Sequence, residues 1–217
     1  MYKSLNKRII AVFDFDGTLT QKDTFIEFIK FTCNPIHYYF GMMLFAPLLV
    51  LMKLHLYSNW KTKEHIFSFF FKNWQYADFK ERGSLFSDVI KNLTRHDTMQ
   101  ILRTHQERGH CVYIISASVE EWVRPWCEQQ GIEHILCTQI EVNKKGRITG
   151  RLKSKNCYGQ EKVNRLLAEE PERNSYFLYA YGDSNGDKKI LSFADKGIKV
   201  SHPIGDNTQK ENSCLLL

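Results

Sequence analysis

The chain has 217 residues, of which 43% are hydrophobic and 25% are charged, and its formal net charge is +6 at pH 7. This is the composition of a soluble globular protein, and no internal repeat or low-complexity tract is visible, which excludes repeat and fibrous architectures. The length can hold one full core plus an insertion. The positive charge suits an anionic substrate or surface but identifies neither.

Neither the cysteines nor the chain ends indicate secretion. The N-terminal residues lack a long apolar stretch with a small-residue cleavage site, so we expect no signal peptide. The last four residues, 214–217, match a prenylation motif, and a coincidental match in a tail is the alternative. The cysteines show no CxxC or His-paired spacing, which favours reduced thiols in a cytosolic protein; they are Cys33, Cys111, Cys127, Cys137, Cys157 and Cys214.

The first predicted element is a strand that ends in two carboxylates. Residues 9–13 form an apolar run typical of a buried parallel strand, and Asp14-Phe15-Asp16-Gly17-Thr18 follows it. Ligands of open α/β sheets bind beyond the carboxyl ends of the strands, so both carboxylates should face a site. Desolvating two negative charges is costly unless a cation or hydrogen bonds offset it, which favours a functional role. The alternative is that Asp16 or Thr18 only caps the next helix.

Residues 22–92 show helical periodicity and no strand signal. Apolar faces recur within 25–29, 66–70 and 79–90. An all-helical insertion in an α/β chain is typical of a second domain. We therefore expect a core domain made of residues 1–20 and 93–217 and a helical cap domain made of residues 21–92.

Residues 31–52 are unusual because they carry no formal charge if His37 is neutral. Their length nearly allows a membrane span, although Pro35 and Pro47 interrupt the segment. Three interpretations stay open, namely a buried cap helix, a helix docked on a membrane surface, and a true span. Lysines at 53, 61 and 63 follow, as an interfacial helix requires, so residues 31–63 are a candidate for peripheral membrane contact.

Alternating helices and strands resume near residue 95. Residues 94–97 are typical of a helix start, and that helix should end before Gly109. A buried strand at 110–115 then ends in Ser116-Ala117-Ser118, and residues 118–121 match a capping box that would begin a helix beside Ser116. A strand follows near 135–136, and segments 138–142 and 147–152 are typical of a hairpin.

The C-terminal third adds two more groups of polar residues. A helical pattern begins at Gly159-Gln160-Glu161-Lys162, and a strand at 176–181 ends in Gly182-Asp183-Ser184-Asn185-Gly186-Asp187. Each predicted strand thus delivers polar side chains at its C-terminal end. The predicted fold class is α/β, with a Rossmann-like parallel sheet core and an inserted helical-bundle cap.

The order DxDGT, Ser, Lys and GDSxxD resembles the four motifs of the haloacid dehalogenase-like (HAD) phosphatase superfamily, across residues 9–200. The helical insertion after the first motif resembles the phosphoserine-phosphatase-like branch, subfamily IB, in which such a cap closes over the site. Many members of that branch have Asn immediately before the second Asp of the last motif. Here Gly186 takes that place and Asn185 stands one position earlier, which leaves the role of Asn185 open.

Phosphate monoester hydrolysis requires charge neutralisation, an aligned nucleophile and a proton for the leaving oxygen. Asp14 is the candidate nucleophile, because carboxylates form aspartyl-phosphate intermediates. Asp16 is the candidate general acid and then base. Ser116, with backbone N–H groups at Ala117, would bind a phosphate oxygen, and Lys162 would supply the fixed cation.

The acidic residues also predict a metal. Asp183, with Asp14 and the backbone carbonyl of Asp16, makes a hard oxygen set suited to Mg²⁺. Asp187 lies one helical turn further on and would orient metal-bound water.

The substrate depends on a finer resemblance. Asp23-Thr24-Phe25, the apolar cap segment and residues 156–163 resemble the bacterial branch that includes phosphatidylglycerophosphatase C. That resemblance implies a lipid-borne phosphomonoester such as phosphatidylglycerophosphate, and a cytoplasmic protein associated with the inner membrane surface. A small soluble phosphomonoester is the alternative. A phosphoserine-like substrate is less favoured, because the Glu that follows the first motif in those enzymes is not matched within residues 19–22.

Two non-enzymatic functions are alternatives to a phosphatase. The basic segment 144–155 would suit a nucleic-acid-binding module, but the four aspartates would repel phosphates without a metal, so we expect no nucleic-acid partner. A catalytically silent scaffold is the other alternative. The intact set of Asp14, Asp16, Lys162 and Asp183 argues against it.

Overall fold

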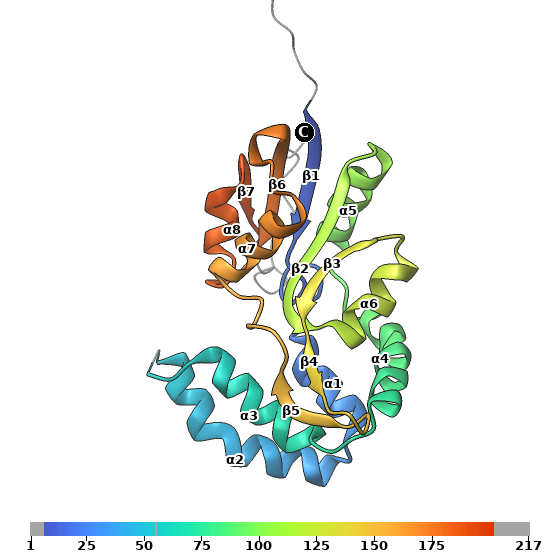
Figure 1. Cartoon of the computed structure of the whole chain (residues 1–217), viewed down its shortest axis with the longest axis vertical. Helices are drawn as coiled ribbons and strands as arrows, with labels where there is room; N and C mark the ends of the chain where they lie inside the picture. Colours follow the sequence, from blue (N-terminus) through green and yellow to red (C-terminus); the bar gives the residue numbers. More distant parts are fainter. Residues whose placement is uncertain (1–6, 55, 202–217) are drawn as a thin grey trace, which may run out of the picture.

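A computed structural model describes residues 7–54 and 56–201. Figure 1 shows a sheet with flanking helices in the upper half and a group of helices in the lower half. The prenylation motif at 214–217 lies outside the described residues. The predicted fold class, an α/β core with a helical cap, is confirmed, whereas the exact domain boundaries stay a prediction.

The core is a five-stranded sheet in which every neighbouring pair is parallel, in the order β3-β2-β1-β6-β7. The strands are β1 (Arg8–Phe13), β2 (Cys111–Val119), β3 (His134–Thr138), β6 (Tyr176–Gly182) and β7 (Lys196–Lys199). The apolar run of β1 is central, since β2 and β6 pair with its two edges and helices cover both its faces. The polar segments after β1, β2 and β6 therefore meet at one edge of the sheet.

Helices cover both faces of this sheet. Ile10 and Val12 of β1 pack with residues of α7 (Gln160–Glu169) and α8 (Lys188–Phe193). Ala11 and Phe13 belong to the other apolar cluster, with α5 (His96–Glu107) and α6 (Glu120–Gln129). This alternation follows from the two-residue period of a strand. A short 3₁₀ helix, η1 (Arg173–Ser175), precedes β6.

The cap contains α1 (Thr24–Thr32), α2 (Pro35–Lys53), α3 (Asn59–Phe71) and α4 (Tyr76–Lys91). Its centre is aromatic: the ring of Phe28 lies 5.6 Å from Phe71, 5.2 Å from Phe86 and 4.6 Å from Trp122 of the core. The predicted hairpin is confirmed as β4 (Ile140–Val142) and β5 (Ile148–Leu152), and β5 packs on α3. In Figure 1 this hairpin extends from the core down beside the cap.

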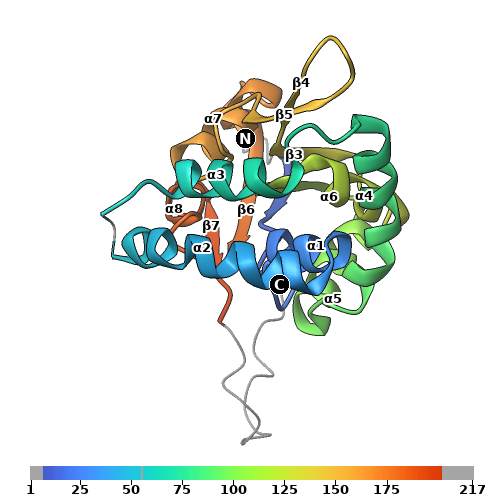
Figure 2. The same ribbon diagram turned by 90° about the horizontal axis from the view of Figure 1, so that it is seen from below.

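The interpretation of residues 31–52 as a buried cap helix is wrong. Of α2, the structure buries only Gly41, which lies against Phe69 and Phe70 of α3. Ile36 and Met43 are 83% and 69% exposed. Figure 2 shows α2 and α3 side by side across one end of the molecule. Because α2 is apolar all round but rests on α3 and α1 alone, much of its apolar surface stays exposed. In the described part of the chain, α2 is the one helix long and apolar enough to cross a membrane.

Candidate active site

A cleft of about 600 Å³ between the core and the cap is lined by Asp14, Asp16, Ser116, Ala117 and Lys162 of the predicted site. Asp183 and Asp187 lie beside Asp14 without lining this cleft. Asp14 and Asp16 follow β1, Ser116 and Ala117 lie near the end of β2, and Lys162 comes from α7. Residues 184–186, after β6, complete the core side, and α1, α2 and α3 supply the cap side. We call this space the aspartate cleft.

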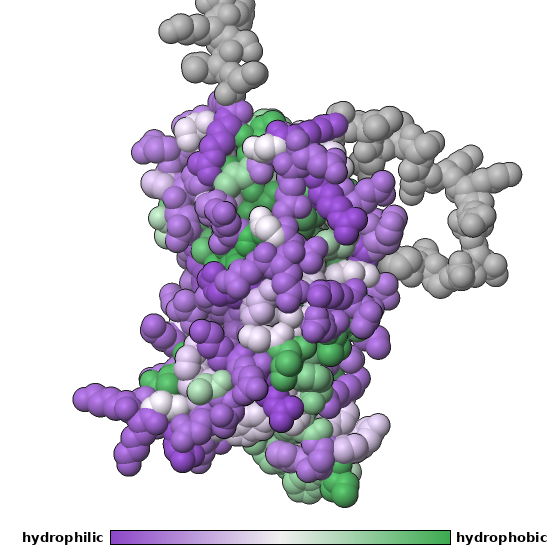
Figure 3. Space-filling model, turned by 90° about the vertical axis from the view of Figure 1, so that its right-hand side faces the viewer, coloured by the Kyte–Doolittle hydropathy of each residue, from purple (hydrophilic) through white to green (hydrophobic). Residues whose placement is uncertain are grey.

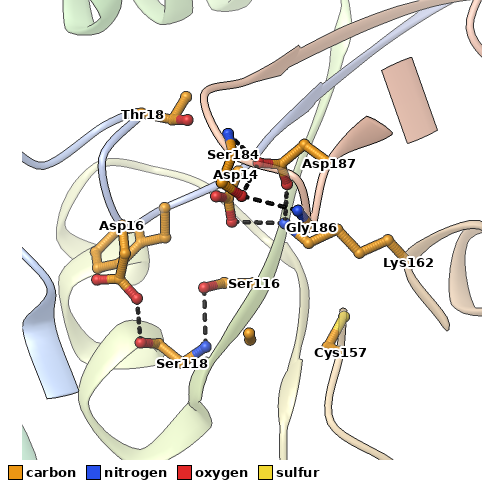
Figure 4. Close-up of polar contacts among 12 residues, drawn as sticks. Asp14, Asp16, Thr18, Ser116, Ser118, Cys157, Lys162, Ser184, Gly186 and Asp187 are labelled. Carbon is orange, nitrogen blue, oxygen red and sulfur yellow. Dashed lines mark hydrogen bonds and ion pairs between the residues drawn. The ribbon is translucent and has the colours of Figure 1, made fainter. Parts of the chain in front are cut away.

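Asp14 and Lys162 form a buried ion pair at the bottom of the cleft (Figure 4). The Lys162 Nζ donates to Asp14 Oδ1 at 2.6 Å and to Asp187 Oδ1 at 2.5 Å, and all three residues are buried. Burial raises the pKa of Asp14 to about 7, although the charge of Lys162 opposes this shift. Burial by itself would lower the pKa of Lys162, but attraction to Asp14 and Asp187 raises it above its ordinary value. Lys162 therefore stays a cation beside the candidate nucleophile.

Three carboxylates come together at this point. One ligand atom each from Asp14, Asp183 and Asp187 lies within 4.8 Å of the others. Asp183 can approach this closely because residue 17 is a glycine. A Cβ on Gly17 would collide with the carboxylate of Asp183, and Gly17 has a left-handed φ of 82°. One lysine cannot balance three acids, so the donor set fits a hard divalent cation such as Mg²⁺.

Asp187 contacts Lys162 directly, whereas the sequence predicts only that it orients metal-bound water. Its Oδ2 accepts from the Ser184 N–H at 3.0 Å and from the Ser184 hydroxyl at 2.7 Å, while Oδ1 accepts from Lys162. The side chain therefore positions Lys162 and also belongs to the group of carboxylates that could hold a metal.

Asp16 points away from this group, toward the cap (Figure 4). Its Oδ1 accepts from the Thr24 N–H at 2.8 Å and the Thr24 hydroxyl at 2.6 Å, and the Ser118 hydroxyl donates to Oδ2. The predicted capping box at 118–121 is therefore wrong. Ser118 is a residue of β2, α6 begins after Val119, and the Ser118 hydroxyl is engaged by Asp16 instead of the helix.

Ser116 and Lys63 both line the aspartate cleft. The Ser116 hydroxyl accepts from the Ser118 N–H at 3.0 Å, which leaves its own hydrogen to donate. Lys63, from α3, donates to the Ala117 carbonyl at 2.7 Å, and its Nζ lies 5.0 Å from the centre of the Phe25 ring. A second cation thus reaches the cleft from the cap.

The departure from the HAD pattern at Gly186 has a steric reason. A Cβ at this position would lie 2.5 Å from Cε2 of the Tyr158 ring, well inside contact distance. Asn185 and Gly186 both line the cleft together with Tyr158. An asparagine at 186 would therefore displace Tyr158.

Sequence reasoning missed Thr24, Ser118 and Lys63 as parts of the site. In the sequence, Thr24 stands out only as part of the motif that carries a family resemblance, without a role of its own, and Ser118 is predicted to cap a helix. Lys63 was grouped with the lysines expected at a membrane, and nothing in the local pattern distinguishes it from Lys61. Its role follows only from the way α3 lies over the core.

Comparisons with known proteins agree with this geometry. The family model for haloacid dehalogenase-like hydrolases matches residues 11–192. The chain is 31% identical to Protein CicA of Caulobacter vibrioides over 194 residues, 88% of this chain and 86% of that protein. It is 31% identical to a histidinol-phosphatase of Neisseria meningitidis over 116 residues, 51% of this chain and 50% of that protein.

A solved structure has the same fold. It is a phosphoserine phosphatase with an analogue of its phospho-aspartyl intermediate, with a TM-score of 0.60 and 17% identity, over 89% of this chain and 86% of that chain. Family, site and fold agree, and the chain belongs to the haloacid dehalogenase-like hydrolases, as a phosphatase of that family.

Proposed function

We propose that the protein is a Mg²⁺-dependent phosphomonoester hydrolase that works through an aspartyl-phosphate on Asp14. The observation that carries this proposal is the buried Asp14 carboxylate, which Lys162 contacts at 2.6 Å and which lies beside Asp183 and Asp187. The ion pair with Lys162 favours the charged form of Asp14 and fixes the position of its carboxylate for attack on a phosphate. Nothing in the packing of a sheet requires such a cluster.

Each residue then has a defined task. Asp14 attacks phosphorus, and Lys162 and the Ser116 hydroxyl neutralise and orient the phosphate oxygens. Asp16, held by Thr24 and Ser118, gives a proton to the leaving oxygen and later takes one from the hydrolytic water. Asp14, Asp183, Asp187 and the Asp16 carbonyl would hold Mg²⁺, which supplies charge neutralisation of the phosphate when bound.

The substrate we infer is a lipid-borne phosphomonoester, such as phosphatidylglycerophosphate. The cap wall of the aspartate cleft is largely apolar, since Met42, Leu49 and Met52 of α2 line it together with Ile26 and Ile66. Lys53 and Lys63 are the cations of this wall. An amphiphile would place its phosphate at Asp14 and its apolar part along α2.

The opposite side of α2 supports a bilayer as the docking partner. Residues 36, 40, 43, 47, 50 and 54 recur every three or four positions and form one exposed stripe, which we call the α2 stripe. Its Ile36, Met43 and Val50 are 83%, 69% and 55% exposed. In Figure 3, hydrophobic side chains show at the lower end of the molecule, which the cap occupies. One helix therefore borders the cleft and offers an apolar face to a membrane surface.

A true span is disfavoured by the neighbours of α2. Helix α3 packs alongside it, and α3 carries Lys61, Lys63 and Glu64 near its start. Inserting α2 across a bilayer would bring these charges into the hydrocarbon, which is costly.

The chemistry is tested by hydrolysis of p-nitrophenyl phosphate with Mg²⁺ and with chelator. We expect metal-dependent turnover, and phosphate trapped on the enzyme by acid quench should be released by alkali and by hydroxylamine, as from an acyl phosphate. Asp14→Asn should abolish turnover without changing the fold. Residual activity within about tenfold of the wild type, a loss below about 1.4 kcal/mol in the barrier, would mean that another nucleophile acts.

The substrate class is tested separately with anionic vesicles that carry phosphatidylglycerophosphate. The Met43→Glu/Val50→Glu variant changes the α2 stripe, and Leu85→Glu, at a 50% exposed residue of α4, is the control. We expect the stripe variant to lose vesicle binding and to hydrolyse the lipid more slowly relative to p-nitrophenyl phosphate. Wild-type protein that ignores vesicles would instead favour a soluble phosphomonoester.

A further inference from the structure

A second cavity, of about 830 Å³, adjoins the aspartate cleft. Its walls are the start of α3 (residues 58–60), the connection from β5 to α7 (residues 152–158) and the first turns of α7. Asn59 and Tyr158 line both spaces, so the two are neighbours that share a boundary. A group bound in the second cavity would lie beside a phosphate held at Asp14.

The cations of this wall outnumber its acids. Lys153 and Lys155 line the second cavity and are exposed. The acid that lines it is Glu161, whose Oε1 is paired with Arg165 at 3.2 Å. The second cavity is therefore positively charged and attracts anions.

The wall is fixed in place by hydrogen bonds. Arg165 donates to the Ser154 hydroxyl at 3.0 Å and to the Lys155 carbonyl at 2.5 Å, which ties the connection to α7. The N–H of Leu152 donates to Glu64 of α3 at 2.9 Å. Core and cap elements thus hold this wall together.

Two helices begin at the second cavity. The structure gives neither Ser58, before α3, nor Gly159, before α7, a side-chain cap within the described residues. These helices have 13 and 10 residues. The positive end of the helix dipole favours an anion at such ends. At α7 the N–H groups of Glu161 and Lys162 already donate to the carbonyls of Tyr158 and Gly159, so the dipole is the contribution of that helix.

A buried donor supplies an independent indication. Asn156 lines the second cavity and is only 7% exposed, and its Nδ2 has no hydrogen-bond partner among the residues that the structure describes. Its orientation is set, because Thr138 Oγ1 accepts from the Cys157 N–H at 3.1 Å and donates to Asn156 Oδ1 at 3.1 Å. A buried amide donor without an acceptor is costly, and an anionic oxygen would satisfy it.

We propose that the second cavity is an anion subsite that binds a second phosphate or a phosphodiester of the substrate's leaving group. This rests on the proposed function, because the scissile phosphate must sit at Asp14. Lys153, Lys155 and the amide of Asn156 are the contacts, and Tyr158 separates the two anions. Gly186 leaves room for Tyr158 in this position, because a Cβ at residue 186 would lie 2.5 Å from the Tyr158 ring.

The test compares glycerol 1,3-bisphosphate with glycerol 3-phosphate, since only the former carries a second phosphate. The specificity ratio is kcat/KM for the bisphosphate divided by kcat/KM for the monophosphate. We expect Lys153→Gln/Lys155→Gln to lower this ratio by about five- to thirtyfold, as for two charge contacts of exposed lysines. The control, Lys144→Gln/Lys145→Gln, removes the same charge from exposed residues outside both cavities and should not change the ratio.

Binding is measured independently of turnover. Calorimetric titration of the Asp14→Asn variant with glycerol 1,3-bisphosphate should give a Kd that rises when Lys153 and Lys155 are also changed. An unchanged ratio and an unchanged Kd would overturn the subsite. A cavity that binds free anions would show the same Kd for sulfate as for the bisphosphate, which would overturn the assignment to the leaving group. If wild-type enzyme hydrolyses no phosphomonoester, the proposed function fails first.

Discussion

Lys162→Met would remove a cation that contacts both Asp14 and Asp187. The Lys162 Nζ is 2.6 Å from Asp14 Oδ1 and 2.5 Å from Asp187 Oδ1, and its side chain is 3% exposed, so solvent screens little of this interaction. Removing one partner of a buried ion pair costs about 3–5 kcal/mol, because the other charge is left uncompensated. A chain of 217 residues loses about 2–4 °C of Tm for each kcal/mol, so Tm should fall by roughly 6–20 °C.

The assay is thermal unfolding in metal-free buffer and again with Mg²⁺. The proposed metal would bind the folded carboxylates and not the unfolded chain, so at about 100 times its Kd it should add about 2.7 kcal/mol of stability. Lys189→Met is the matched control, because it removes the same charge from an exposed residue. A metal-free loss in Lys162→Met no larger than that of the control would show that Lys162 does not neutralise the buried acids.

Three further predictions concern turnover and pH. Asp16→Asn should slow dephosphorylation of Asp14 more than it slows phosphorylation of Asp14 by an aryl phosphate. A dephosphorylation rate equal to that of the wild type in rapid-quench experiments would contradict the general-base role. Ca²⁺ should inhibit turnover, because its longer bonds and higher coordination number let it bind both carboxylate oxygens of Asp14. Full turnover with Ca²⁺ alone would refute this metal geometry. Burial raises the pKa of Glu121 to about 7 from an ordinary 4.5, so the folded state binds the extra proton and stability is lost as pH rises between these values. In urea unfolding, the free energy of unfolding of Glu121→Gln should therefore rise relative to that of the wild type from pH 5 to pH 8. A constant difference between the two free energies over this range would exclude the raised pKa of Glu121.

The sequence predicted the core of the site because topology alone assembles it. Asp14 and Asp183 each follow a parallel strand and Ser116 lies near the end of another, and parallel strands bring their carboxyl ends to one edge. Lys162 was placed by its position in the motif order and is indeed beside Asp14.

Local patterns failed where the partner of a side chain lies far away in the chain. Ser118 matches a capping box, but its hydroxyl contacts Asp16, 102 residues earlier. The burial of residues 31–52 was wrong for a similar reason. Apolar composition shows that a helix can be buried, and only the packing of α3 and α1 shows how little of α2 they cover.

The contact between Lys63 and the Ala117 carbonyl joins the cap to the segment that would bind phosphate. Any motion that lifts α3 from the core has to break this hydrogen bond and remove a positive charge from the cleft. The affinity of the cleft for phosphate would therefore fall as the cleft opens, so that release of the product and movement of the cap are thermodynamically coupled. Inorganic phosphate would then be released both because the cleft opens and because the positive charge of Lys63 moves away from it.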